Sequence, residues 1–156
     1  MYLPRPEGGP YEICPNGTHV AVCYRFIDLG TQRFYHSGGP IDQRKVQISW
    51  ELPEQLMTEG EFAGQPFTHH QQYTWSMNAN ATLRKHLEGW RGVPFNDDEF
   101  GPGGCDIRDI LGKACMLSIR HVSTGFRTYA RLSSISRAPK GASPIGSPSN
   151  AIQYFS

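Results

Sequence analysis

The sequence lacks a hydrophobic run of the length that a membrane span needs, which is about 18 apolar residues. Its first residues, MYLPRPEGGPYE, also lack the apolar core of a secretory signal peptide. These two absences argue against membrane insertion and against secretion. We therefore expect no contact with membranes and a location in the cytoplasm.

Cysteine is scarce, and the spacing of cysteine and histidine does not match a structural metal site. The nearest pair among the four cysteines, Cys14 and Cys23, is separated by far more residues than zinc sites use. His69 and His70 are adjacent, so on a strand they point to opposite faces and only one of them is solvent-exposed. We expect reduced thiols, no metal and no cofactor.

Catalytic signatures are missing as well. The chain has no G-x-S-x-G motif, and the glycines of GPGGC (101–105) lack the following Lys-Ser or Lys-Thr of a phosphate-binding loop. The acidic run Asp97, Asp98, Glu99 has the character of a solvated turn or a helix start. The sequence therefore predicts a protein that is not an enzyme.

Strong net charge is also absent, because 15 basic residues face 14 acidic ones. This balance excludes a polybasic protein with a global positive field. The distribution is uneven, however, since no acidic residue follows Asp109. Six basic residues do follow it: Lys113, Arg120, Arg127, Arg131, Arg137 and Lys140.

What the chain does contain is a set of β-branched and aromatic runs typical of strands. The predicted strands are Thr18–Leu29, Lys45–Leu52, Phe67–Met77, Lys113–Val122 and Phe126–Arg137. Between the third and fourth, Leu83, Leu87 and Trp90 follow the helical period, with Asn78 or Asn80 as the cap and Gly92 as the stop. Residues 31–44 are predicted to be a loop. Trp50 and Trp90 are predicted to pack in the core.

The order of three strands, one helix and two strands, with a long first strand, is that of an OB-fold. We therefore predict a mainly β protein: a five-stranded OB-type barrel over 17–140, an irregular N-terminal arm over 1–16 and a flexible tail over 141–156. A sheet meander with an embedded helix would give the same order.

An OB barrel binds ligands across its second and third strands, flanked by the loops between strands one and two and strands four and five. Cations and aromatic rings, the groups that hold single-stranded nucleic acid, occur at these places. The predicted binding residues are Arg33, Phe34, Tyr35, Arg44, Lys45, Tyr73, Trp75, Arg120, Phe126, Arg127, Tyr129 and Arg131.

The amino-acid sequence of several segments resembles that of a bacteriophage family described as OB-fold, single-stranded DNA-binding proteins. These segments are FIDLGTQ (26–32), KVQISWELP (45–53), YTWSMNANATLRKHLEGWRGVPF (73–95), DIRDILGKACMLSI (106–119) and SISRAPKG (134–141). The resemblance implies DNA replication or recombination in the bacterial host, with single-stranded DNA and replication or recombination proteins as partners. The chain departs from many single-stranded DNA-binding proteins in ending AIQYFS rather than in an acidic tail.

The expected function is therefore non-enzymatic, largely sequence-independent binding of single-stranded DNA, by a monomer or a homo-oligomer. Because OB barrels serve many ligands, an alternative is a protein-interaction module that acts on a host or phage enzyme. A third reading is a binder of RNA or of double-stranded ends.

Overall fold

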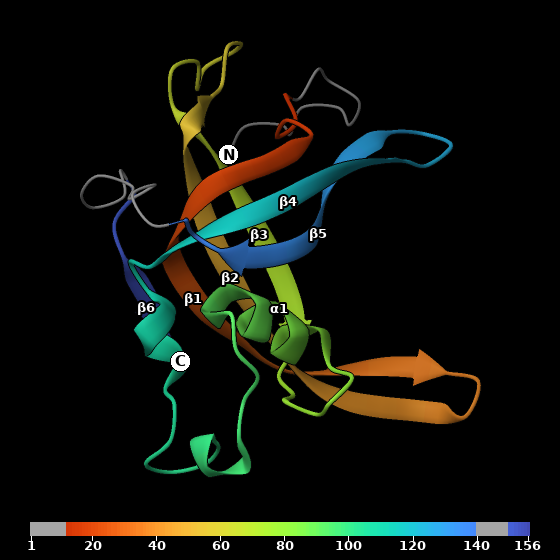
Figure 1. The fold of residues 1–156 in the computed structure, drawn as a ribbon. Coiled ribbons are helices and arrows are strands. Elements are labelled where there is room, and N and C mark those ends of the chain that lie inside the picture. The colour runs from red at the N-terminus through yellow and green to blue at the C-terminus, as the bar shows by residue number, and fades with distance from the viewer. Residues whose placement is uncertain (1–11, 140–149) are drawn as a thin grey trace.

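The computed structural model describes residues 12–139 and 150–156, and these residues form an antiparallel sheet with one helix (Figure 1). The strand order across the sheet is β3-β2-β1-β4-β5. The elements are β1 (Gly17–His36), β2 (Gly39–Leu56), β3 (Pro66–Thr74), α1 (Thr82–Arg91), two 3-10 turns (Asp97–Glu99 and Ile107–Ile110), β4 (Ala114–Ser123), β5 (Thr128–Arg137) and β6 (Gln153–Phe155). The predicted mainly β fold, with one helix between the third and fourth strands, is confirmed.

The sheet is not closed into a barrel within the described residues, because no strand pairing joins β3 to β5. Its curvature comes from β1, which pairs with β4 from Gly17 to Val22 and with β2 from Val22 to His36. Register shifts in β1 near Cys23 and Asp28 mark bulges, which bend a strand and raise its twist. The long first strand thus serves two half-sheets.

The core lies inside this curved sheet and is covered at one end by α1. Trp50 is fully buried and Trp90 is 8% exposed, as predicted for both. Trp90 also donates a hydrogen bond from Nε1 to the Ala114 carbonyl at 2.9 Å. Leu83 supplies the other buried side chain of the helix, and α1 packs against β5 and β3 to cover the core.

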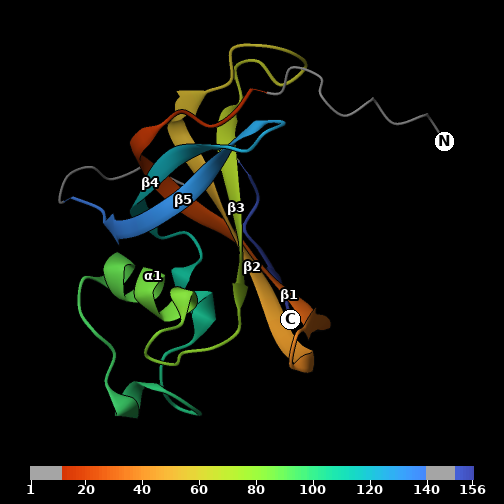
Figure 2. The same cartoon turned by 90° about the vertical axis from the view of Figure 1, so that its right-hand side faces the viewer.

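Two hairpins extend from the body, and both project toward the side that faces the viewer in Figure 2. One is formed by β1 and β2 and the other by β4 and β5. The prediction that residues 31–44 form a loop is wrong, since β1 runs to His36 and β2 starts at Gly39. An arm that stands away from the body buries neither face, so its sequence carries no apolar alternation. The ion pair between Arg33 and Asp42 on opposite strands helps to hold it.

The start of α1 also differs from its prediction. The N-cap residue is Ala81 and no side chain caps the helix, whereas Asn78 or Asn80 was expected. The loop after β3 places both asparagines before the first turn. The predicted stop at Gly92 is confirmed: Gly92 adopts φ 81° and its N–H bonds to the Glu88 carbonyl.

The end of the chain was predicted to be a flexible tail, but Gln153–Phe155 forms β6, which pairs parallel to Arg25–Ile27 of β1. β4 ends its pairing with β1 at Val22, which leaves this edge open. The Tyr154 ring stacks on Phe26 with centroids 5.6 Å apart. The flexibility predicted for 141–149 lies outside the described residues.

Of the predicted N-terminal arm, residues 12–16 are described. The Glu12 carboxylate accepts hydrogen bonds from the backbone N–H groups of Thr58 and Glu59, and these bonds lower its pKa. The side chain of Cys14 is buried. These contacts attach the end of the arm to the turn after β2. No helix in the described ranges is long and apolar enough to cross a membrane.

Candidate functional site

A groove of about 970 Å³ lies between the edges of β3 and β5. Its walls are Gln71–Thr74 of β3 and Arg131–Ile135 of β5, and the start of α1 closes one end. Because β3 pairs only with β2 and β5 only with β4 in the described chain, each strand presents an unpaired edge near the groove. The groove is thus the open seam of the curved sheet.

The charge of the groove is of one sign. Lys45, Lys85 and Arg131 are the charged residues among the described ones that line it, and none of the lining residues is acidic. Lys45 Nζ donates to Thr74 Oγ1 at 2.7 Å, which fixes the ammonium group over the boundary between β2 and β3. The groove can therefore attract an anion.

The β1–β2 arm begins beside the groove and carries three predicted residues. Phe34 is half-buried, with its ring centroid 5.0 Å from Lys45 Nζ. Tyr35, nearer the tip, is 80% exposed. Arg33 is engaged by Asp42, with Nε and Oδ1 2.8 Å apart. Of these three, Tyr35 is the group most available to a ligand.

The β4–β5 arm carries Phe126 at its turn, fully exposed, and Tyr129 at 38% exposure. Arg120 and Arg131 are direct cross-strand partners, so two cations occupy neighbouring positions on one face of the arm. Arg127, also predicted, is exposed in the turn. This arm therefore presents rings and cations to solvent.

Of the predicted residues, Lys45, Tyr73 and Arg131 line the groove, and those on the two arms lie outside its lining. Arg44 and Trp75 lie neither in the groove nor on the exposed ends of the arms. Arg44 lies next to Lys45, so on β2 it faces the opposite side. There it forms an ion pair with Asp28, whose pKa is lowered by the hydrogen bonds from Arg44. Trp75 packs edge-on to Phe26 and lines a separate apolar pocket of about 200 Å³ with Met77, Leu87 and Phe100.

Tyr73 lines the groove but cannot offer its ring. The side chain is 3% exposed, and its hydroxyl lies 2.6 Å from His86 Nδ1. Burial lowers the pKa of His86 and raises that of Tyr73, which keeps both groups neutral. This pair links β3 to α1 and shapes the wall.

Several lining residues escaped the sequence prediction. They include Lys85 of α1 and the amide side chains Gln43, Gln71, Gln72, Asn78 and Asn80. The polar face of the predicted helix was the one signal that pointed to Lys85. No local pattern in the sequence shows that the edges of β3 and β5 stay unpaired in the described chain.

The rest of the described structure offers little for covalent or metal chemistry. Burial raises the pKa of Cys14 to about 11 and that of Cys23 to about 12, so both thiols stay protonated. Cys105 and Cys115 are also free thiols. Within 12–139 and 150–156, no three His, Cys, Asp or Glu side chains are grouped so as to hold a metal ion. His69 is buried and His70 is exposed, as expected of adjacent residues on a strand.

Comparison with known proteins adds no relative. No model of a protein family matches the chain, and no curated protein matches its sequence.

Proposed function

We propose that this protein binds single-stranded DNA, with the phosphate backbone along the groove and bases stacked on the two arms. The observation that carries the proposal is the wholly cationic groove, with Lys45 at the base of one arm and Arg131 in the strand that forms the other. Cations that follow a backbone, combined with rings that stack on bases, are the two requirements for single-strand binding.

The like-charged pair on the β4–β5 arm supports the proposal. Equal charges directly opposite each other across two strands destabilise a sheet. Arg120 and Arg131 occupy such positions, and neither forms an ion pair in the described chain. A cost to folding of this kind is understandable if an anionic ligand lies between them.

We further propose that the sheet is an OB-type barrel whose seam is open. The order β3-β2-β1-β4-β5 is the order of an OB sheet, and β3 and β5, its two ends, flank one groove. An OB-fold is itself a partly open barrel that binds oligonucleotides across strands two and three between two loops. In this chain those loops would be the tips of the two arms.

The resemblance to phage single-stranded DNA-binding proteins supports placing this activity in phage DNA replication or recombination in the host cytoplasm. The protein would protect or present single strands and would catalyse no reaction. The alternative, a module that binds a host or phage enzyme, is an outcome of the experiment that follows.

The test is a fluorescence titration of the full chain with oligo-dT at about 50 mM salt, where electrostatic binding is strong. We expect quenching of intrinsic fluorescence and saturable binding. Tyr35→Ala and Phe126→Ala should each weaken binding by about 1–3 kcal/mol, the usual effect of losing a stacked base.

The matched control is Phe62→Ala, which removes a ring that is 54% exposed in the turn between β2 and β3 and does not line the groove. This variant should bind like the wild type. Absence of binding to oligo-dT at low salt, together with capture of a nuclease-resistant partner from host lysate, would replace the proposal with the interaction module.

A further inference from the structure

The groove offers a different kind of contact from the arms. Among its described lining residues, Tyr73 is the one with a phenol ring, and that ring is buried. Stacking is therefore available at the arms and not in the groove. What the groove offers instead is a set of amide side chains: Gln43, Gln71, Gln72, Asn78 and Asn80.

Most of these amides are ready to bind. Gln72, Asn78 and Asn80 are exposed and Gln43 is half-buried, and their side chains make no hydrogen bond among the described residues. Gln71 is the exception, because its Nε2 donates to the Gln72 carbonyl at 3.2 Å. Four amides therefore keep a free donor and a free acceptor each.

The strands place two of the amides around the fixed cation. Alternate residues on a strand share a face, so Gln43 lies on the face of β2 that carries Lys45, and Gln72 on the face of β3 that carries Thr74. The bond of 2.7 Å from Lys45 to Thr74 shows that these two faces are continuous. A phosphate bound at Lys45 would thus bring the adjoining bases within the neighbourhood of Gln43 and Gln72.

We infer that the groove reads base edges and that it favours adenine, an inference that rests on the proposed function. An amide holds a donor beside an acceptor, which matches the amino group and N7 of adenine in a two-bond contact. Every base has a donor beside an acceptor on its pairing edge, which is open in a single strand, so adenine offers an amide a match on two edges and thymine on one. Guanine presents two acceptors on its outer edge and suits arginine instead. The arms then supply affinity for any base, and the groove supplies the preference for adenine.

The experiment compares two oligonucleotides of about 20 nucleotides, oligo-dT and the same strand with four thymines replaced by adenine, by fluorescence anisotropy with the full chain. We expect the wild type to bind the adenine-containing strand about five-fold or more tightly, the effect of one good two-bond contact. The double variant Gln43→Ala/Gln72→Ala should lose that preference by weakening binding to the adenine-containing strand alone.

Two control variants separate a preference for adenine from changes that affect the binding of both strands. Gln65→Ala removes an exposed amide that does not line the groove, and it should keep the preference. Tyr35→Ala should weaken both strands by the same factor. Tight but equal binding of both strands by the wild type, or a preference that survives in the double variant, would overturn the inference and leave the proposed function standing. Failure to bind either strand would overturn both.

Discussion

The contact between Tyr73 and His86 shows how a single pair can be misjudged from sequence and still matter to the site. The sequence predicts Tyr73 as a binding residue because an OB barrel binds its ligand across the second and third strands. In the structure the ring is buried and its hydroxyl meets the imidazole at 2.6 Å. This hydrogen bond connects β3 to α1 and fixes the wall of the groove.

The burial of His86 makes stability depend on pH. Its pKa is lowered from 6.5 in the folded protein, so below that pH the unfolded chain binds more protons than the folded one. Stability is therefore full above pH 6.5 and decreases as the pH falls from 6.5 toward the folded pKa. Burial lowers the pKa of His69, and partial desolvation together with the nearby Arg25 cation lowers that of His70, so both contribute in the same direction. We expect a lower urea midpoint at pH 5 than at pH 7.5.

His86→Asn, which keeps an acceptor for the Tyr73 hydroxyl but cannot titrate, should reduce that difference. His36→Asn, at the exposed end of β1, is the matched control and should leave the difference unchanged. If His86→Asn loses as much stability between the two pH values as the wild type does, His86 is not a source of the pH dependence.

At the scale of elements, prediction from sequence succeeds where one face of an element is buried by its neighbours. The alternation of Val46, Ile48 and Trp50 gave the second strand, and the helical spacing of Leu83 and Trp90 gave α1, because in both cases the apolar residues meet the core. The outer parts of β1 and β2 have no such neighbour. They form a hairpin through backbone pairing and the Arg33–Asp42 ion pair, which leave no periodic pattern.

β6 is an element that local sequence patterns do not predict. Three exposed residues form a strand because an edge of β1 is free at Arg25–Ile27 and because Phe26 offers a ring to Tyr154. Neither condition is visible in the sequence around 153–155. Elements of this kind depend on a partner far away in the chain, so local patterns do not find them.

The packing of α1 against β5 depends on one glycine. A Cβ atom at Gly89 would lie 2.2 Å from the Ile135 carbonyl oxygen, which is backbone and cannot turn away. Gly89→Ala gains about 1 kcal/mol of helix propensity but forces the helix off the strand, at a cost of about 1–3 kcal/mol or more. We expect a net loss in the free energy of unfolding, measured by urea denaturation.

Gly125→Ala provides the comparison, because a Cβ atom at Gly125 meets nothing within 4 Å and the change is chemically identical. The urea midpoint of unfolding of Gly125→Ala should match that of the wild type. A Gly89→Ala variant as stable as the Gly125→Ala variant would mean that α1 is not in close contact with the Ile135 backbone.

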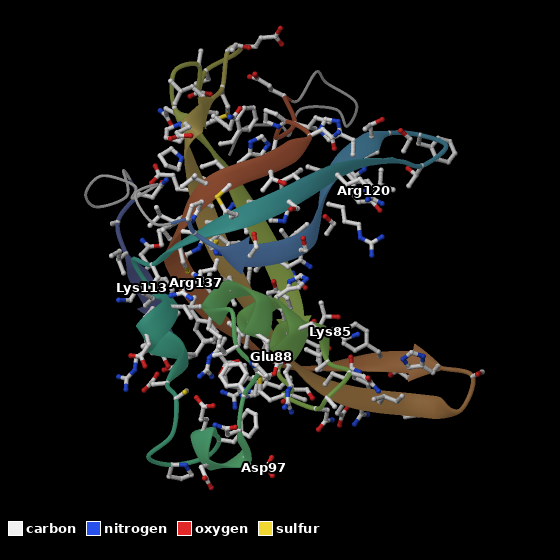
Figure 3. All side chains as sticks on the ribbon, in the orientation of Figure 1. Lys85, Glu88, Asp97, Lys113, Arg120 and Arg137 are labelled. Carbon is white, nitrogen blue, oxygen red and sulfur yellow. The ribbon has the colours of Figure 1, made fainter. Side chains whose placement is uncertain are left out.

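For the molecule as a whole, 15 basic residues balance 14 acidic ones, whereas the charged residues that line the groove are all cations. Figure 3 shows Lys85 and Arg120 on the side of the two arms, whereas Asp97 lies in the loop after α1, beyond the helix. The sequence predicts Tyr35, Lys45, Phe126 and Arg131 as binding residues, and that role stays a prediction. It could not predict the seam, because the approach of β3 to β5 is set by the curvature of the complete sheet.

The salt dependence of DNA binding tests whether the cations act at the seam or merely add to the total charge. Each phosphate neutralised on a single strand contributes about 0.7 to the slope of log K against log salt concentration. Lys85→Gln removes a lining cation and should lower the slope by about that amount and weaken binding at low salt. Lys113→Gln removes the same charge from an exposed position outside the groove, on the side of the molecule opposite the arms in Figure 3. Because the net charge of the two variants is equal, a change in slope confined to Lys85→Gln would assign the phosphates to the seam, whereas equal slopes in both would exclude it.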